Sequence, residues 1–83
     1  MNILLFAQLR DYYGASSAEY SDDELPLTVE ELRRSLASRG SDEFREALLA
    51  PNVFCAVNQK VVDLDHTVRV GDEVGFFPPM TGG

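Results

Sequence analysis

A helix start at Thr28 is the strongest local signal in the chain, and it separates two groups of strand-like segments. The Thr28 side chain can accept a hydrogen bond from the backbone of Glu31, while the Glu31 side chain can reach back to the backbone of Thr28, which is a capping box. Apolar residues follow at helical spacing at Val29, Leu32 and Leu36. The pattern predicts a helix over residues 29–39 that Gly40 closes in a left-handed conformation.

Strand-like segments precede and follow this helix. Alternating apolar residues make residues 2–10 a predicted central strand, and residues 18–20 a short return strand. After the helix, a second short helix is expected to begin at Ser41 or Asp42 and to stop before Pro51. The later predicted strands are residues 53–57 and residues 60–62, joined by a turn at Asn58 and Gln59, then residues 68–70 and a final strand over residues 73–77.

These elements fit one small domain, because 83 residues suffice for a single apolar core. If the long helix crosses one face of the sheet, the first and last strands can lie parallel in its middle. The sequence therefore predicts an α+β fold of the ubiquitin-like β-grasp type, with a mixed sheet of about four to five strands, one main helix and one short helix. We expect this domain over residues 1–77, and an extended, flexible C-terminal tail over residues 78–83.

The charge balance and the cysteine content exclude several functional classes. Fourteen acidic and seven basic residues give a formal charge of −7, which would repel a nucleic-acid backbone. Cys55 is the single cysteine, so no internal disulfide can form, and no charged leader or long apolar run stands in the sequence. We therefore expect a cytoplasmic protein with neither nucleic-acid nor membrane partners.

Three further features favour structural roles over chemical ones. Cys55 lies within an apolar strand, where a buried core side chain is expected. His66 stands in a polar stretch and lacks companion ligands, so we expect a surface position and no metal site. The acidic run of Asp22, Asp23 and Glu24 has neither the glycine nor the ligand spacing of a calcium loop and is expected to be a solvated turn.

Strand alternation also predicts an apolar surface on the side of the sheet away from the helix. The residues expected there are Leu4, Phe6, Gly75 and Phe77. Exposed aromatic rings beside the start of the tail predict a surface that docks partner proteins, with Arg10 and Val61 at its rim. The alternative is that the second short helix folds over this surface.

The chain ends in two glycines after a stiff pair of prolines. Because glycine has no side chain, a terminal carboxylate on Gly83 could enter a narrow active site. Six extended residues span about 20 Å at about 3.3 Å per residue. We predict that Gly83 carries the chemistry and that the preceding tail enters a partner's active site, through Pro78, Pro79, Met80, Thr81 and Gly82. The alternative is an inert, frayed terminus.

Four segments of the chain carry a family resemblance. They are residues 5–10 (Leu-Phe-Ala-Gln-Leu-Arg), residues 28–33 (Thr-Val-Glu-Glu-Leu-Arg), residues 56–59 (Ala-Val-Asn-Gln) and residues 71–83 (Gly-Asp-Glu-Val-Gly-Phe-Phe-Pro-Pro-Met-Thr-Gly-Gly). Together they resemble the small, sulfur-carrier subunits of molybdopterin synthases. The last segment is the most specific, because an aromatic strand end, a double proline and a terminal diglycine occur together.

The resemblance implies a sulfur cycle on Gly83. An adenylating enzyme, similar to those that activate ubiquitin, would join the Gly83 carboxylate to AMP. A sulfur donor, such as a cysteine desulfurase or a rhodanese-type protein, would then convert it to a thiocarboxylate. The large synthase subunit would use that sulfur to build the dithiolene of molybdopterin from cyclic pyranopterin monophosphate. The chain itself would be non-catalytic alone and would bind no cofactor, and ATP would bind the activating enzyme, because the sequence has no Walker-type glycine loop.

Two other functions would use the same tail. A carrier for another sulfur pathway, such as thiamine synthesis, cysteine synthesis or tRNA thiolation, would load Gly83 in the same way and deliver sulfur to another acceptor. A ubiquitin-like modifier would instead form isopeptide bonds with target lysines. The Phe-Phe-Pro-Pro stretch at residues 76–79 favours the synthase subunit.

Overall fold

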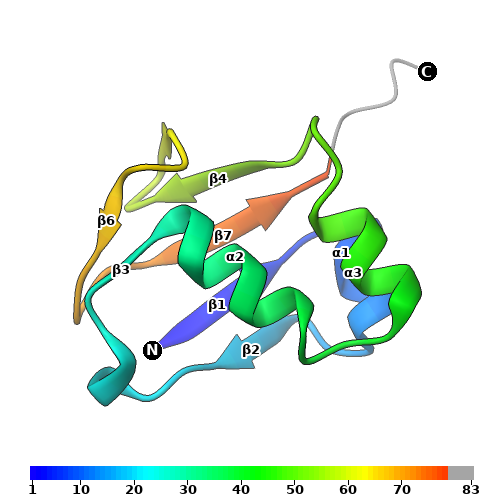
Figure 1. Ribbon diagram of the computed structural model, residues 1–83, viewed down its shortest axis with the longest axis horizontal. Helices are drawn as coiled ribbons and strands as arrows, with labels where there is room; N and C mark the ends of the chain where they lie inside the picture. Colours follow the sequence, from blue (N-terminus) through cyan, green and yellow to red (C-terminus); the bar gives the residue numbers. More distant parts are fainter. Residues whose placement is uncertain (79–83) are drawn as a thin grey trace.

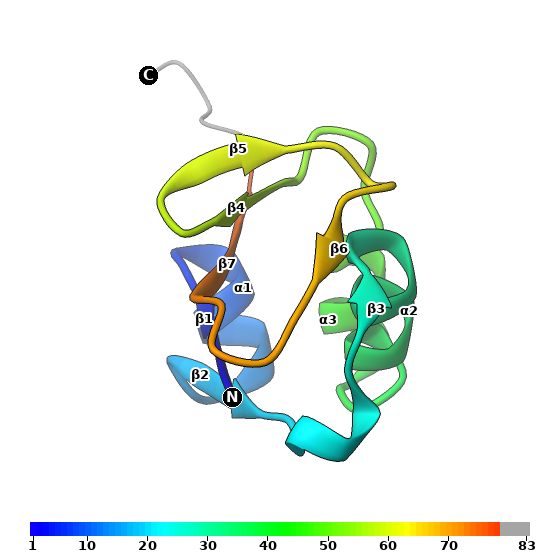
Figure 2. The same ribbon diagram turned by 90° about the vertical axis from the view of Figure 1, so that its left-hand side faces the viewer.

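The computed structural model describes residues 1–78 as a sheet with helices packed on one side (Figure 1). Within that range the main sheet has five strands in the order β2-β1-β7-β4-β5. They are β1 (Asn2–Leu5), β2 (Ser17–Glu19), β4 (Phe54–Val57), β5 (Lys60–Val62) and β7 (Val74–Phe77). A short second pair, β3 (Leu27–Thr28) with β6 (Thr67–Val68), lies beside the main sheet (Figure 2).

The parallel pair β1 and β7 forms the centre of the main sheet. Ile3 pairs with Val74 and Leu5 with Phe76, while β2 and β4 flank the pair as antiparallel neighbours. Parallel neighbours need a long crossover connection, and the chain between these two strands supplies it. The predicted mixed sheet, with its first and last strands side by side in a β-grasp arrangement, is confirmed.

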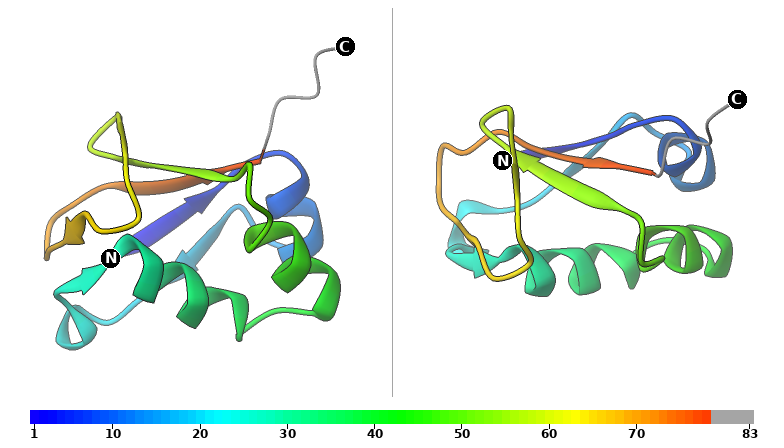
Figure 3. Two further views of the ribbon diagram at one scale, coloured as in Figure 1. Left: turned by 45° about the horizontal axis from the view of Figure 1, so that its top comes forward. Right: turned by 90° about the horizontal axis from the view of Figure 1, so that it is seen from above.

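The main helix α2 (Val29–Ala37) begins at the predicted capping box. Glu31 N donates to Thr28 Oγ1 at 3.1 Å, and Thr28 N donates to Glu31 Oε1 at 2.8 Å. The short helix α3 (Asp42–Leu48) likewise begins after a serine N-cap. Figure 3 shows α2 and α3 on the same face of the sheet, and in residues 1–78 no helix lies over the opposite face.

The core fills the space between the sheet and the helices. Side chains from all of these elements are at most 2% exposed there: Ile3, Leu5, Val74 and Phe76 from the strands, and Val29, Leu32, Leu36, Phe44 and Leu48 from the helices. In residues 1–78 every buried side-chain nitrogen or oxygen has a hydrogen-bond partner. The predicted alternation, in which every second strand residue points toward the helices, is therefore confirmed.

The prediction of a single strand over residues 2–10 is wrong in its second half. Ala7 adopts φ = 50°, a positive value that residues other than glycine rarely take, strand pairing ends there, and α1 (Gln8–Tyr13) follows. This helix buries Leu9 completely, and the Tyr13 ring packs against an aromatic ring of α3 with 4.8 Å between centroids. The apolar alternation of the sequence continues past Ala7 and therefore does not show where the strand ends. The contacts of α1 with α3, which is distant in sequence, decide the local structure.

The predicted left-handed closure at Gly40 is also wrong. The cap after α2 is Ser38 in a right-handed conformation, whereas the glycines with positive φ are Gly14 and Gly71. Gly40 serves packing instead, because a Cβ built on it would overlap the Phe44 ring. The glycine therefore lets the first turn of α3 approach the connection from α2.

Two short elements agree with the sequence patterns, whereas the strand predicted over residues 68–70 is observed as β6 at Thr67–Val68, paired with the unpredicted β3. Asn58 and Gln59 take φ = 52° and 69° and form the predicted two-residue turn between β4 and β5. The acidic run forms the exposed turn η1 (Asp22–Glu24). Among the described residues no helix combines the length and the apolar character needed to cross a membrane.

Candidate functional site

Three aromatic rings stack on the sheet face opposite α2. The Phe77 ring lies between those of Phe6 and Phe54, with centroid distances of 4.3 and 5.0 Å and planes inclined by 6° and 8°. The rings come from the end of β7, the segment after β1 and the start of β4. Phe6 and Phe54 remain 37% and 38% exposed, so the stack leaves apolar surface in contact with water.

The strand register places further small and apolar residues in one row beside the stack. Leu4 pairs with Gly75, Gly75 with Ala56, and Ala56 with Val61. Residues that lie directly opposite each other across a sheet share a face. We call the resulting surface the outer face, and its residues are Leu4, Phe6, Phe54, Ala56, Val61, Gly75 and Phe77.

Gly75 determines how closely the rings approach the sheet. A Cβ built on Gly75 would lie 3.1 Å from Cε2 of Phe6 and 3.4 Å from Cε1 of Phe77. The first distance is shorter than an ordinary van der Waals contact between carbon atoms. The absence of a side chain at this position therefore allows both rings to rest on the strand.

The outer face contains a hollow of about 180 Å³ with a polar rim at Gln59 and Glu73. Asn58 fixes this rim, since its Nδ2 donates to Asp72 Oδ1 and its Oδ1 accepts from Glu73 N, both at 3.0 Å. Asp72 Oδ2 accepts from Arg69 N at 2.8 Å, and this bond, with the one from Asn58, lowers the pKa of the Asp72 carboxyl. The turn that contains Asn58 is thus hydrogen-bonded to the turn that contains Asp72.

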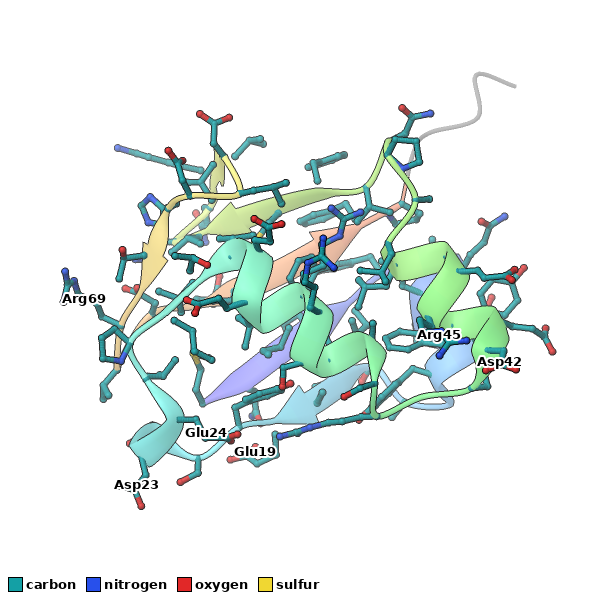
Figure 4. The ribbon with its side chains drawn as sticks, in the orientation of Figure 1. Glu19, Asp23, Glu24, Asp42, Arg45 and Arg69 are labelled. Atoms are coloured by element: carbon teal, nitrogen blue, oxygen red, sulfur yellow. The ribbon has the colours of Figure 1, made fainter. Side chains whose placement is uncertain are left out.

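Acidic side chains also lie at other places on the molecule. Figure 4 shows Glu19, Asp23 and Glu24 near the connection from β2 into η1, and it shows Asp42 beside Arg45 on α3. The Asp42 Oδ1 to Arg45 Nη2 distance is 3.2 Å, in an exposed ion pair of the kind that adds little stability. Among the described residues that line the hollow, Glu73 is the one charged side chain. The outer face therefore offers mainly apolar contacts.

Four of the residues expected on a docking surface lie together on the outer face: Leu4, Phe6, Gly75 and Phe77. Val61 ends the row on the edge strand β5 and is 69% exposed. Arg10 lies on α1, because the strand ends before it, and its Nε is 3.6 Å from Asp11 Oδ1. The expectation of one strand over residues 2–10, from which Arg10 was placed at the rim of the surface, is therefore wrong.

Phe54 is the residue of the aromatic stack that the sequence pattern does not identify. Its outward direction follows from the inward direction of Cys55. Its place beside Phe77 requires the pairing of β4 with β7, which joins segments far apart in the sequence. The alternative that the second helix covers the surface is excluded for the described residues, because α3 packs against α1 and α2 on the other side of the sheet.

The residues expected to have structural roles occupy structural positions. Cys55 is 3% exposed, and burial raises the pKa of its thiol to about 12. His66 is exposed, and its carbonyl oxygen accepts from Val29 N at 2.9 Å. Among residues 1–78 no group of three or more His, Cys, Asp or Glu side chains could hold a metal ion.

The outer face ends where the predicted tail begins. Phe77 closes β7, and the half-buried Pro78 is the last described residue. The other predicted tail residues, Pro79, Met80, Thr81, Gly82 and Gly83, lie outside the described residues. The aromatic stack therefore lies directly beside the start of the tail at Pro78, with no other element between them.

Known proteins resemble the chain over its whole length. A model described as the ThiS family matches residues 3–83. The chain belongs to the ThiS family. It is 45% identical over 83 residues to the molybdopterin synthase sulfur carrier subunit of Escherichia coli (strain K12), and 40% identical over 83 residues to that of Haemophilus influenzae. Each match covers 100% of this chain and 99% of the relative.

A solved structure shares the fold of the chain over nearly its whole length. The solution structure of the Haloferax volcanii HVO 2177 protein superposes with a TM-score of 0.76 at 28% identity. The superposition covers 99% of this chain and 84% of that protein. The ThiS match also includes residues 78–83, so the segment predicted to carry the chemistry belongs to the region that the family shares.

Proposed function

We propose that this member of the ThiS family is the sulfur carrier subunit of a molybdopterin synthase. The observation that carries the proposal is the full-length identity of 45% and 40% to two subunits of that name. The outer face supports it, because an exposed aromatic stack at the start of the tail suits a protein that presents its terminus to other proteins. The cytoplasm is the proposed site of action.

Gly83 carries the proposed chemistry. An activating enzyme joins the Gly83 carboxylate to the α-phosphate of ATP, and pyrophosphate leaves. The terminal sulfur of a persulfide on a cysteine desulfurase or rhodanese-type protein then attacks the carbonyl carbon, AMP departs, and an acyl disulfide joins Gly83 to the donor. A thiol cleaves the sulfur–sulfur bond and is itself oxidised to a disulfide with the donor cysteine, and a thiocarboxylate remains on Gly83. Its sulfur is softer and more polarizable than oxygen and is the better nucleophile. The large subunit delivers it to cyclic pyranopterin monophosphate, and this chain supplies no catalytic side chain of its own.

The outer face is the proposed docking surface for the large subunit and for the activating enzyme. Phe6, Phe54 and Phe77 supply the aromatic anchors, and the hollow beside Gly75 accepts a side chain of the partner. Pro78 follows directly, so a protein seated on the stack receives the tail at its own surface. Docking thereby brings the Gly83 carboxylate close to the partner's active site before any bond is formed.

Reconstitution tests the proposed reaction. Chain loaded with sulfur is combined with a large synthase subunit and cyclic pyranopterin monophosphate, and formation of molybdopterin is measured. The control variant carries one alanine appended after Gly83, which moves the carboxylate away from the diglycine without changing the domain. We expect molybdopterin from the normal chain and none from the extended one. Equal product from both would contradict the proposed role of Gly83.

Intact-mass measurement of the protein from cells separates the related functions. A sulfur carrier shows the mass change of one oxygen exchanged for sulfur. A ubiquitin-like modifier shows a ladder of conjugates, and an inert tail shows neither. A chain that acquires sulfur but produces no molybdopterin with the large subunit would belong to another sulfur pathway.

A further inference from the structure

The hollow of the outer face has an apolar end and an acidic end. The rings of Phe6 and Phe77 line its apolar end, and Gln59 and Glu73 line its polar rim. Glu73 directly precedes β7 and is separated from Phe77 by about 13 Å of chain, at about 3.3 Å per residue. Gly75 lies between these two residues and has no side chain to fill the hollow. The acidic end therefore lies away from the start of the tail.

Glu73 is fixed through its backbone, whereas its carboxylate is free. Asn58 N donates to the Glu73 carbonyl oxygen at 2.8 Å, and Glu73 N donates to Asn58 Oδ1 at 3.0 Å. The neighbouring carboxylate differs, because both oxygens of Asp72 accept hydrogen bonds. Within residues 1–78 the Glu73 carboxylate accepts no hydrogen bond and joins no ion pair. The fold thus holds a negative charge at the rim without a partner for it.

The cationic residues of the adjacent segments are directed away from this rim. Lys60 pairs with Val57, and residues directly opposite each other across a sheet share a face. The Val57 side chain belongs to the core between the sheet and the helices, so Lys60 extends from the side opposite the outer face. Figure 4 shows the Arg69 side chain extending outward at the edge of the molecule. The charge of Glu73 therefore remains available to another protein.

A long cationic side chain matches both ends of the hollow. Apolar walls suit methylene groups, and a carboxylate at the rim suits a positive head group. A partner that covers the hollow removes its water, which favours a guanidinium, because this group is more weakly hydrated than an ammonium. The five N–H donors of a guanidinium can serve the Glu73 carboxylate and the Gln59 amide oxygen together. These properties favour arginine over lysine.

We propose that the hollow receives an arginine of the large synthase subunit and that Glu73 is its counter-charge, an inference that rests on the proposed function. The arginine stem lies over Gly75, and its guanidinium pairs with the Glu73 carboxylate. The aromatic stack and this ion pair hold the partner at two points, about 13 Å apart along the strand. Two separated contacts fix the orientation of the partner as well as its position. Glu73 therefore determines which proteins can receive the tail.

Binding kinetics of the large subunit test this pair. Glu73→Gln removes the charge at nearly constant shape, and Glu46→Gln, at an exposed position of α3 on the other side of the sheet, is the matched control. We expect Glu73→Gln to dissociate at least about tenfold faster than the parent, because it leaves the partner's cation covered and unpaired. We expect the control to stay within about twofold. Surface plasmon resonance measures both rates, and circular dichroism verifies the fold.

Three results of this experiment would overturn the inference. The first is a parental dissociation rate in Glu73→Gln. The second is an effect confined to the association rate and equal in Glu46→Gln, which would indicate long-range attraction between net charges instead of a local pair. The third is an unfolded Glu73→Gln variant, which would show that the carboxylate supports the domain.

A double-mutant cycle identifies the cation of the partner. Each arginine and lysine on the surface of the large subunit is replaced by alanine and measured against the parent chain and against Glu73→Gln. We expect one arginine whose loss costs much less affinity in the Glu73→Gln background, because the two residues form one interaction. Additive losses at every arginine, or coupling of Glu73 to a lysine, would contradict the assignment.

The parent chain separates this inference from the proposed function. A parent that binds the large subunit and yields molybdopterin, together with a Glu73→Gln variant of parental kinetics, contradicts the ion pair and leaves the proposed function standing. A parent that neither binds a large synthase subunit nor yields molybdopterin contradicts the proposed function, and the inference falls with it.

Discussion

At two glycines of this chain, the absence of a side chain allows a neighbouring aromatic ring to pack closely. A Cβ on Gly75 would press against the rings of Phe6 and Phe77, and a Cβ on Gly40 would overlap the ring of Phe44. The affected rings differ in their surroundings, since Phe44 is fully buried whereas Phe6 is exposed on the outer face. The same small substitution should therefore have different consequences at the two sites.

Gly75→Ala is expected to weaken binding of the large synthase subunit about tenfold, with a loss of about 1 kcal/mol in the free energy of unfolding. The added methyl lifts the Phe6 ring from the strand and changes the shape of the docking surface. Titration calorimetry measures the affinity, and urea unfolding measures stability. Gly40→Ala is the matched control, expected to cost about 1–3 kcal/mol of stability and to leave affinity unchanged. Normal affinity in Gly75→Ala would contradict the proposed surface.

At the scale of elements, α1 is the segment that most changes the predicted fold. Leu9→Ala is expected to lower the free energy of unfolding by about 2–5 kcal/mol, because the Leu9 side chain is completely buried. Arg10→Ala, on the exposed side of the same helix, is expected to stay within about 0.5 kcal/mol of the parent. Urea unfolding of both variants measures the difference. Equal stabilities would mean that α1 contributes nothing to the core.

The elements that the sequence predicts are those with local causes. The capping box at Thr28 and Glu31 lies within four consecutive residues, and the turn at Asn58 and Gln59 within two. By contrast, the break at Ala7 depends on packing between α1 and α3, which no short window contains. The same dependence on segments distant in sequence explains why the sequence predicts only part of the outer face. Alternation within each strand predicts the direction of Phe77, but pairing between β4 and β7 is needed to bring in Phe54.

At the scale of the whole molecule, the fold divides its apolar residues between two purposes. The helices lie on one face of the sheet and bury the core, whereas the described residues leave the other face open to solvent (Figure 3). A formal charge of −7 favours solubility of the free chain despite this open surface. Binding of a partner would remove the aromatic stack from water and would gain free energy that folding alone does not use.

Phe77→Glu is expected to weaken association with the large subunit by about thirtyfold or more, since a buried hot-spot aromatic contributes about 2 kcal/mol or more. Phe54→Glu should act in the same direction, because its ring, 38% exposed, stacks on Phe77 from the β4 side. Val70→Glu is the control, with a side chain 59% exposed and outside the outer face. Circular dichroism should show all three variants folded, because none of these rings or side chains belongs to the core between the sheet and α2. A folded Phe77→Glu variant with parental affinity would show that the partner docks elsewhere, and an unfolded Phe54→Glu variant would show that the stack holds the domain together rather than presenting its tail.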